Sequence, residues 1–131
     1  MNPIIIAALL LLGTYSEEDY YAVIRYPIQA VYQPDYPAGG WTFCGDKTIY
    51  INLGVDADPT GVAATMAHEE SHLSDYRFGC GPGKETKAML RTLRVYQRVD
   101  APMWRQEWAR GWYWRFWHQE HPKHWSLGII P

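Results

Sequence analysis

Two histidines four residues apart, His68 and His72, are the residues whose types and spacing most clearly suggest chemistry. On an α-helix, residues i and i+4 lie on one face, one turn apart. Both imidazoles could then reach one tetrahedral zinc ion at about 2.0–2.1 Å, with Glu70 and Ser71 as spacers of the turn. Glu69 could face a water in the open position of the metal. Zinc would lower the pKa of that water towards ~7, so that Glu69 could take its proton as general base.

The segment 68–72 reads His-Glu-Glu-Ser-His and resembles the HExxH signature of the zincin metallopeptidases. The resemblance implies a zinc-dependent enzyme that hydrolyses peptide bonds in a peptide or protein substrate. His68 and His72 would be metal ligands and Glu69 the catalytic base. The resemblance also implies that the strand before the helix lies at the edge of a sheet and pairs with an extended substrate. Thr48–Leu53 is the segment in that position.

A catalytic zinc site needs a third protein ligand, and Asp75 is the first carboxylate after the motif. On a straight helix, Asp75 lies about 7–8 Å along the axis from the midpoint of the two histidines. Its short side chain is better placed to accept the outer N–H of a ligand imidazole, which would hold that ring in position. The segment from His68 to Tyr76 also resembles the HExxHxxDY form of lethal-factor-like metallopeptidases, whose third ligand is a later glutamate.

Glu85 is the second carboxylate, in the first turn of the next expected helix. The residues 79–84 are enough chain to bring it back to the level of the metal. Glu85-Thr-Lys-Ala88 resembles the Glu-x-x-Ala of many small gluzincins, which implies that Glu85 is the third ligand. Asp75 remains the alternative ligand. Without a metal, Glu85 would be an acid that complements the helix dipole.

The elements that position these residues indicate one α+β domain with a small, mainly antiparallel sheet. Alternating apolar residues, loop signals and turn signals predict one or two strands over 20–32, a loop over 33–40 and a hairpin over 41–53. Asp58 as cap and Pro59 at the first helical position begin the helix that carries the motif. The helices are expected at about 58–78, 84–99 and 102–118.

The N-terminus carries an apolar run, Ile4–Leu12, which is too short for a bilayer span of roughly 20 residues. Its length and the small residues after it fit a secretory signal. We therefore expect residues 1–16 to be a leader, residues 17–131 to form the domain, and the protein to be exported, either secreted or periplasmic. A buried first element or a membrane-associated end is the alternative.

Cys44 and Cys80 are the two cysteines of the chain. In an exported protein they could form a disulfide that ties the segment before the motif to the loop after it. Unpaired thiols are the alternative, because two isolated cysteines make a poor zinc site.

The net charge of −2 gives no reason to expect nucleic-acid binding. The last part of the chain is basic, and Trp104, Trp108 and Trp112 recur in it at four-residue steps. Such a stripe could close the core of a small domain or contact a membrane surface or a partner. The second possibility gives an alternative function, a zincin-like domain that binds through this helix without proteolysis.

Overall fold

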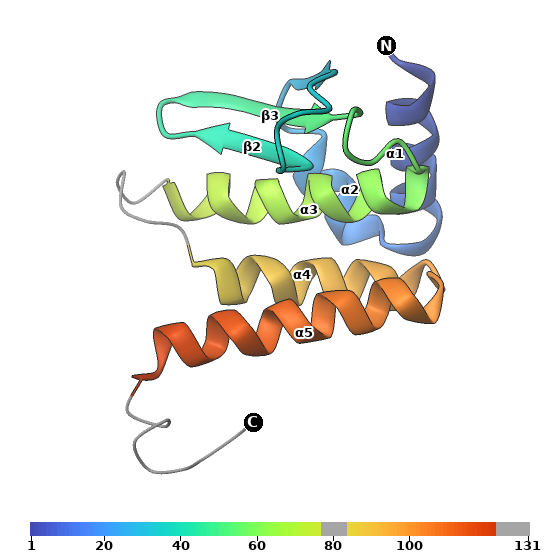
Figure 1. Cartoon of the computed structure of the whole chain (residues 1–131). Helices are drawn as coiled ribbons and strands as arrows, with labels where there is room; N and C mark the ends of the chain where they lie inside the picture. Colours follow the sequence, from blue (N-terminus) through green and yellow to red (C-terminus); the bar gives the residue numbers. More distant parts are fainter. Residues whose placement is uncertain (77–83, 123–131) are drawn as a thin grey trace.

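The helix that carries the two histidines lies between a three-stranded sheet and the two C-terminal helices (Figure 1). The computed structural model of the chain describes residues 1–76 and 84–122, and it confirms the expected α+β class. Its elements are α1 Pro3–Tyr15, α2 Glu17–Val23, β1 Ile28–Val31, β2 Gly40–Phe43, β3 Asp46–Asn52, α3 Pro59–Asp75, α4 Glu85–Arg98 and α5 Met103–Glu120.

Helix α3 begins where the sequence predicts. The Asp58 carboxylate accepts a hydrogen bond from the Thr60 amide at 2.8 Å, and Pro59 occupies the first turn. The helix buries its apolar face, with Val62 and Met66 fully enclosed. Burial of each such side chain contributes about 1.5–3 kcal/mol. Since α3 contacts β2, β3, α1, α2 and α4, the position of the histidines is fixed from several sides.

The sheet is mixed, with the order β1-β3-β2. β2 and β3 form the expected antiparallel hairpin, whereas β1 pairs with β3 in parallel. Thr48–Leu53, expected at the edge, therefore corresponds to the central strand, and that expectation is wrong. The physical reason is that β1, from Ile28 to Val31, pairs with the edge of β3 that the hairpin leaves free. In the described part of the chain, β2 and β1 are the edge strands.

Residues 17–23 form helix α2, although the sequence suggested that strand structure begins near residue 20. Glu17, Glu18 and Asp19 occupy its first turn, where acidic side chains are favoured by the helix dipole. The strand expected in this region is limited to β1.

The apolar N-terminal run forms helix α1, which packs against α3. Ile5, Ala8 and Leu12 are buried in the main core, whereas Leu10 on the other face is 67% exposed. This burial fits the alternative of a buried first element, and the division into a leader over 1–16 and a domain over 17–131 stays a prediction. None of the helices in residues 1–76 and 84–122 combines the length and apolar character that a membrane crossing needs. Export of the protein stays a prediction.

Candidate metal centre and its groove

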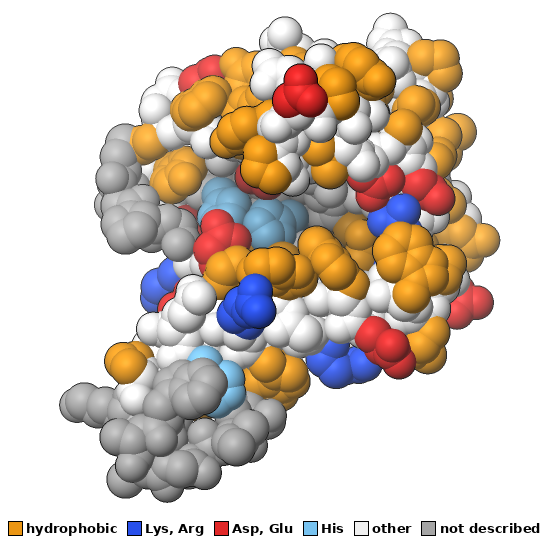
Figure 2. Space-filling model, viewed as in Figure 1, with side chains coloured by type: hydrophobic (Ala, Val, Ile, Leu, Met, Phe, Trp, Pro, Cys, Tyr) orange, Lys and Arg blue, Asp and Glu red, His pale blue; other side chains and the backbone are white. Residues whose placement is uncertain are grey.

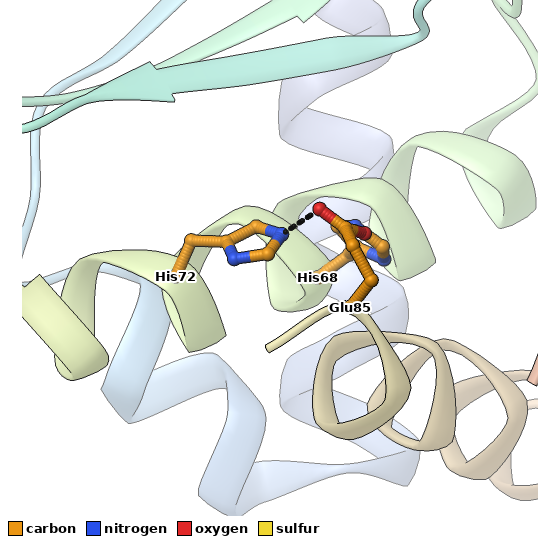
Figure 3. A group of neighbouring side chains, drawn as sticks. All are labelled: His68, His72 and Glu85. Atoms are coloured by element: carbon orange, nitrogen blue, oxygen red, sulfur yellow. Dashed lines mark ion pairs between the residues drawn. The ribbon is translucent and has the colours of Figure 1, made fainter. Parts of the chain in front are cut away.

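Helices α3 and α4 bring together the three side chains His68, His72 and Glu85. One potential ligand atom of each lies within 4.8 Å of those of the others. The Glu85 carboxylate points at the two imidazoles, with Oε1 at 3.0 Å from His72 Nε2 and Oε2 at 3.3 Å from His68 Nε2 (Figure 3). In the described part of the chain no other group of three His, Cys, Asp or Glu side chains is arranged in this way.

The three groups influence one another's ionisation. Hydrogen bonds from His68 and His72 hold the pKa of Glu85 well below its ordinary value. Burial is the largest single influence on His72 and acts to lower its pKa, but the hydrogen bond to Glu85 and the negative charges of Glu85, Glu69 and Asp75 together outweigh it, so the pKa of His72 is raised. The Glu85 carboxylate therefore attracts positive charge to the point where the three side chains meet. A bound cation would take the place of the protons there.

Asp75 is not part of this group. Its Oδ1 accepts a hydrogen bond from Lys87 Nζ at 2.8 Å, and its buried Oδ2 has no hydrogen-bond partner among the described residues. The same holds for the buried Nδ1 of His72. The structure thus brings Glu85 to the imidazoles and does not bring Asp75 into a hydrogen bond with either ring.

A residue that the sequence analysis missed, Thr92, supports His68 from the side away from Glu85. Thr92 Oγ1 lies 3.0 Å from His68 Nδ1 and 3.2 Å from the carbonyl oxygen of Ala88. The Thr92 side chain comes from α4, two turns beyond Glu85, and is buried. The only sequence signal for Thr92 is its spacing of seven residues from Glu85, because residues i and i+7 share a helix face.

Glu69 and the three potential ligands line one hollow in the surface. This hollow has a volume of ≈ 340 Å³ and is also lined by Trp41 of β2 and by Tyr76. Burial raises the pKa of Glu69, and the charges of His68 and His72 act in the opposite direction. Tyr76 shares this hollow with all three potential ligands.

A second hollow of ≈ 490 Å³ continues from the first, because both are lined by Ala38, Gly40, His68 and Glu69. Figure 2 shows the resulting groove between the sheet and α4, with histidine side chains in pale blue inside it. The far half is largely apolar. Its lining includes Val55, Met89, Tyr96, Trp104, Arg105 and Trp108.

The tryptophan stripe is divided between two environments. Trp112 packs against the core, as the core-packing interpretation expects. Trp104 and Trp108 are 61% and 51% exposed and line the groove, so that interpretation is wrong for them. The difference arises because α5 covers α4 with one face only and extends its first two turns beside the open groove.

Gly40 allows β2 to approach α3 closely beside Glu69. A Cβ atom at this position would lie 2.7 Å from Thr65 Cγ2 and 2.8 Å from the Tyr50 carbonyl oxygen. It would also lie 3.4 Å from Glu69 Cγ. Glycine is therefore required if the edge strand is to form the wall of the groove beside Glu69.

Asn52 holds the loop that continues this wall. Its buried side chain accepts hydrogen bonds from the amides of Gln33 and Gly54, at 2.9 and 3.1 Å. Its Nδ2 donates to the carbonyl oxygens of Gln33 and Ala38, at 2.9 and 3.0 Å. One amide side chain thus satisfies backbone groups that no strand partner satisfies. No spacing rule in the sequence indicates this role.

Glu70, which the sequence suggested was only a spacer between the two histidines, has a structural role. It is 4% exposed and pairs with the guanidinium of Arg91 on α4. Arg91 also binds Asp19 of α2, with Nη2 at 2.8 Å from Oδ1. The group ties α2, α3 and α4 together on the face of α3 opposite His68 and His72.

The expected pairing of Cys44 with Cys80 involves a residue outside the described part of the chain, and it stays a prediction.

No family model matches the sequence, and neither a curated protein nor a solved structure is similar enough to it to count as a match.

Proposed function

We propose that the protein is a zinc-dependent metallopeptidase. The observation that carries the proposal is the convergence of His68, His72 and Glu85 within 4.8 Å, in a groove that also contains the buried carboxylate of Glu69. The first two residues come from one helix and the third from the next, so the cluster does not follow from local spacing alone. Three protein ligands that leave a position open are typical of catalytic rather than structural zinc sites.

The donor set is compatible with zinc. Two imidazole nitrogens and one carboxylate oxygen form a ligand set known from zinc peptidases. Other divalent first-row metals also accept these donors, so the identity of the metal is part of the proposal. When bound there, zinc would act as a Lewis acid that lowers the pKa of a coordinated water towards ~7.

Glu69 and Tyr76 are the side chains that would act on the substrate. Glu69 would take a proton from the attacking water at its carboxylate and pass it to the leaving amine. Its burial in the hollow supports this role, because a partly desolvated carboxylate is a stronger base. Tyr76 lines the same hollow, and its hydroxyl would donate a hydrogen bond to the oxyanion.

The shape of the groove supports an extended peptide as substrate. β2 is an edge strand and lines the ligand hollow through Gly40, Trp41 and Thr42. A peptide could pair with its free edge and direct alternate side chains into the groove. The far half of the groove would receive a bulky apolar side chain, because Val55, Met89 and Trp108 line it.

The experiment that tests the proposal combines zinc stoichiometry with a Glu69→Gln variant. We expect one zinc per chain in both proteins, and hydrolysis of a mixed peptide library by the wild type only. Glu107→Gln is a matched control, because Glu107 is exposed on α5 and lines neither hollow. A wild-type protein that binds no zinc after equilibration with the metal would contradict both the site and the activity.

A second function has support from the exposure of Trp104 and Trp108. These rings could bind a membrane surface or a partner without any proteolysis. Vesicle binding that is lost on Trp104→Ala and Trp108→Ala, together with no hydrolysis of any library peptide, would favour it. The position of both rings in the wall of the groove favours the peptidase.

A further inference from the structure

The Thr92 hydroxyl has two neighbours, the Ala88 carbonyl oxygen and His68 Nδ1, and the first determines the direction of both hydrogen bonds. A threonine hydroxyl has one proton to donate and lone pairs that accept. The Ala88 carbonyl oxygen at 3.2 Å can only accept, so it takes the hydroxyl proton. The atom at 3.0 Å on the other side, His68 Nδ1, must then be the donor. The chain of hydrogen bonds runs from His68 Nδ1–H to Thr92 and from Thr92 to the backbone.

This direction determines which imidazole nitrogen of His68 is available for a metal. A neutral imidazole with its proton on Nδ1 has a lone pair on Nε2. Nε2 is the atom that faces Glu85, at 3.3 Å from Oε2. Without a metal, Nε2 shares a proton with Glu85. When a cation displaces that proton, the hydrogen bond to Thr92 keeps the remaining proton on Nδ1, so that the Nε2 lone pair points to where the three potential ligands meet.

We propose that Thr92 is a positioning residue, which holds His68 in the Nδ1–H tautomer and in the ring orientation that metal binding needs. The inference rests on the proposed metal site and goes beyond it, because Thr92 is neither a ligand nor part of the HExxH motif. The two ligand imidazoles are unequal in this respect. His68 has a hydroxyl partner behind it, whereas the buried Nδ1 of His72 has no hydrogen-bond partner in residues 1–76 and 84–122.

Two substitutions separate the hydroxyl from the shape of the side chain. Thr92→Val keeps the volume and removes the acceptor, and Thr92→Ser keeps the hydroxyl. Loss of a supporting hydrogen bond behind a ligand histidine costs about 10- to 100-fold in metal affinity. We expect zinc affinity, measured by competition with a chromophoric chelator, to fall by that factor in Thr92→Val and to stay close to wild type in Thr92→Ser.

Thr65→Val is a matched control. Thr65 is also a helical threonine whose hydroxyl donates to the carbonyl four residues earlier, at 2.9 Å, and among the described residues it makes no hydrogen bond to an imidazole. Its substitution should leave zinc affinity unchanged. Thermal unfolding of the metal-free variants would show whether Thr92→Val folds as the wild type does.

A spectroscopic measurement gives a result that a purely structural role of Thr92 would not change. In zinc-loaded protein labelled with ¹⁵N-histidine, the Nδ1–H of His68 should give a signal protected from solvent exchange. This signal should persist in Thr92→Ser and lose its protection in Thr92→Val. Equal zinc affinity and equal protection in wild type and Thr92→Val would overturn the inference.

The outcomes also distinguish this inference from the proposed function. Zinc binding that depends on Thr92 without peptide hydrolysis would contradict the peptidase and support the positioning role. Peptide hydrolysis with zinc affinity that is indifferent to Thr92→Val would do the reverse. A wild-type protein without zinc affinity would contradict both.

Discussion

The two carboxylates that follow the histidine motif differ in what surrounds them. Glu85 faces the imidazoles of His68 and His72 from a neighbouring helix. Asp75 continues along the helix of the histidines and pairs with Lys87, whose side chain is 56% exposed. A side chain on the same helix moves away from the metal level by 1.5 Å per residue, whereas a facing helix can present its carboxylate at that level.

The first prediction compares these two carboxylates. Glu85→Gln should weaken zinc binding by more than the roughly 10- to 100-fold typical of a lost supporting contact, because it removes a charged ligand. Asp75→Asn should lower zinc affinity by no more than about 100-fold, the upper end of the loss typical of a supporting contact. Equilibrium dialysis against buffered zinc measures both. The reverse order of effects would assign the third ligand to Asp75.

The edge strand β2 forms one wall of the groove beside His68 and His72. Its distance from α3 depends on Gly40, where a methyl group would collide with Thr65 and with the Tyr50 backbone. None of the three potential ligands is on β2. In the proposed function, substrate alignment and metal binding would therefore depend on different elements.

The second prediction follows from this separation. Gly40→Ala should displace β2 and lower kcat/KM for peptide hydrolysis by on the order of 10- to 100-fold, because misplacement by about 1 Å is enough for such a loss. Zinc affinity should stay unchanged. Gly111→Ala is the control, since a Cβ at Gly111 on α5 meets nothing within 4 Å. Equal losses in both variants would exclude a specific role of β2.

Helices α2, α3 and α4 are joined by a buried group of charges on the far side of α3. Glu70 and Asp19 both bind Arg91, and Arg98 Nη1 lies 3.2 Å from Asp19 Oδ2. The two carboxylates, Glu70 and Asp19, and the two guanidinium groups, Arg91 and Arg98, balance one another's charges. This group fixes the orientation of α4 and thereby of Glu85.

The third prediction concerns its stability. Glu70→Ala should lower the free energy of unfolding by about 3 kcal/mol, because it leaves the buried Arg91 partly uncompensated. Lys87→Ala removes the exposed partner of Asp75 and should cost about 0–1 kcal/mol. Urea denaturation of the metal-free proteins compares the two. Similar small losses would mean that the Arg91 group contributes little.

Across the whole molecule, the core extends from the N-terminal helix to the C-terminal helix. Ile5 and Leu12 of α1 belong to the same buried cluster as Met66 of α3 and Ala109 of α5. The segment that the sequence suggested as a leader is therefore packed on the helix that carries the motif. Its removal would expose one side of α3.

The fourth prediction tests the contribution of α1 with two leucines of the same helix. Leu12→Ala should destabilise the protein by about 2–5 kcal/mol, because it opens a cavity in the core. Leu10→Ala, at a position that is 67% exposed, should change stability by no more than about 0.5 kcal/mol. The comparison is made by chemical denaturation of the full chain. Equal effects would show that α1 is not part of the cooperative core.

The sequence by itself determined the features that depend on neighbours along the chain. The cap at Asp58, the helix through the motif and the shared face of His68 and His72 follow from helical periodicity and capping, which act within a few residues. The β2–β3 hairpin follows from its turn, and the α+β class follows from the sum of such local signals. The choice of Glu85 as the expected third ligand rested on a resemblance in the first turn of the next helix.

The tertiary structure alone decided how these elements meet. Strand order depends on whether β1 pairs with the free edge of β3, and no local pattern encodes that pairing. The contact of Thr92 with His68 spans 24 residues, and the Arg91–Asp19 pair spans 72. Such contacts depend on the packing of whole helices and on the apolar area that this packing buries. They determine which carboxylate faces the histidines, which strand lines the groove and which hydroxyl contacts His68.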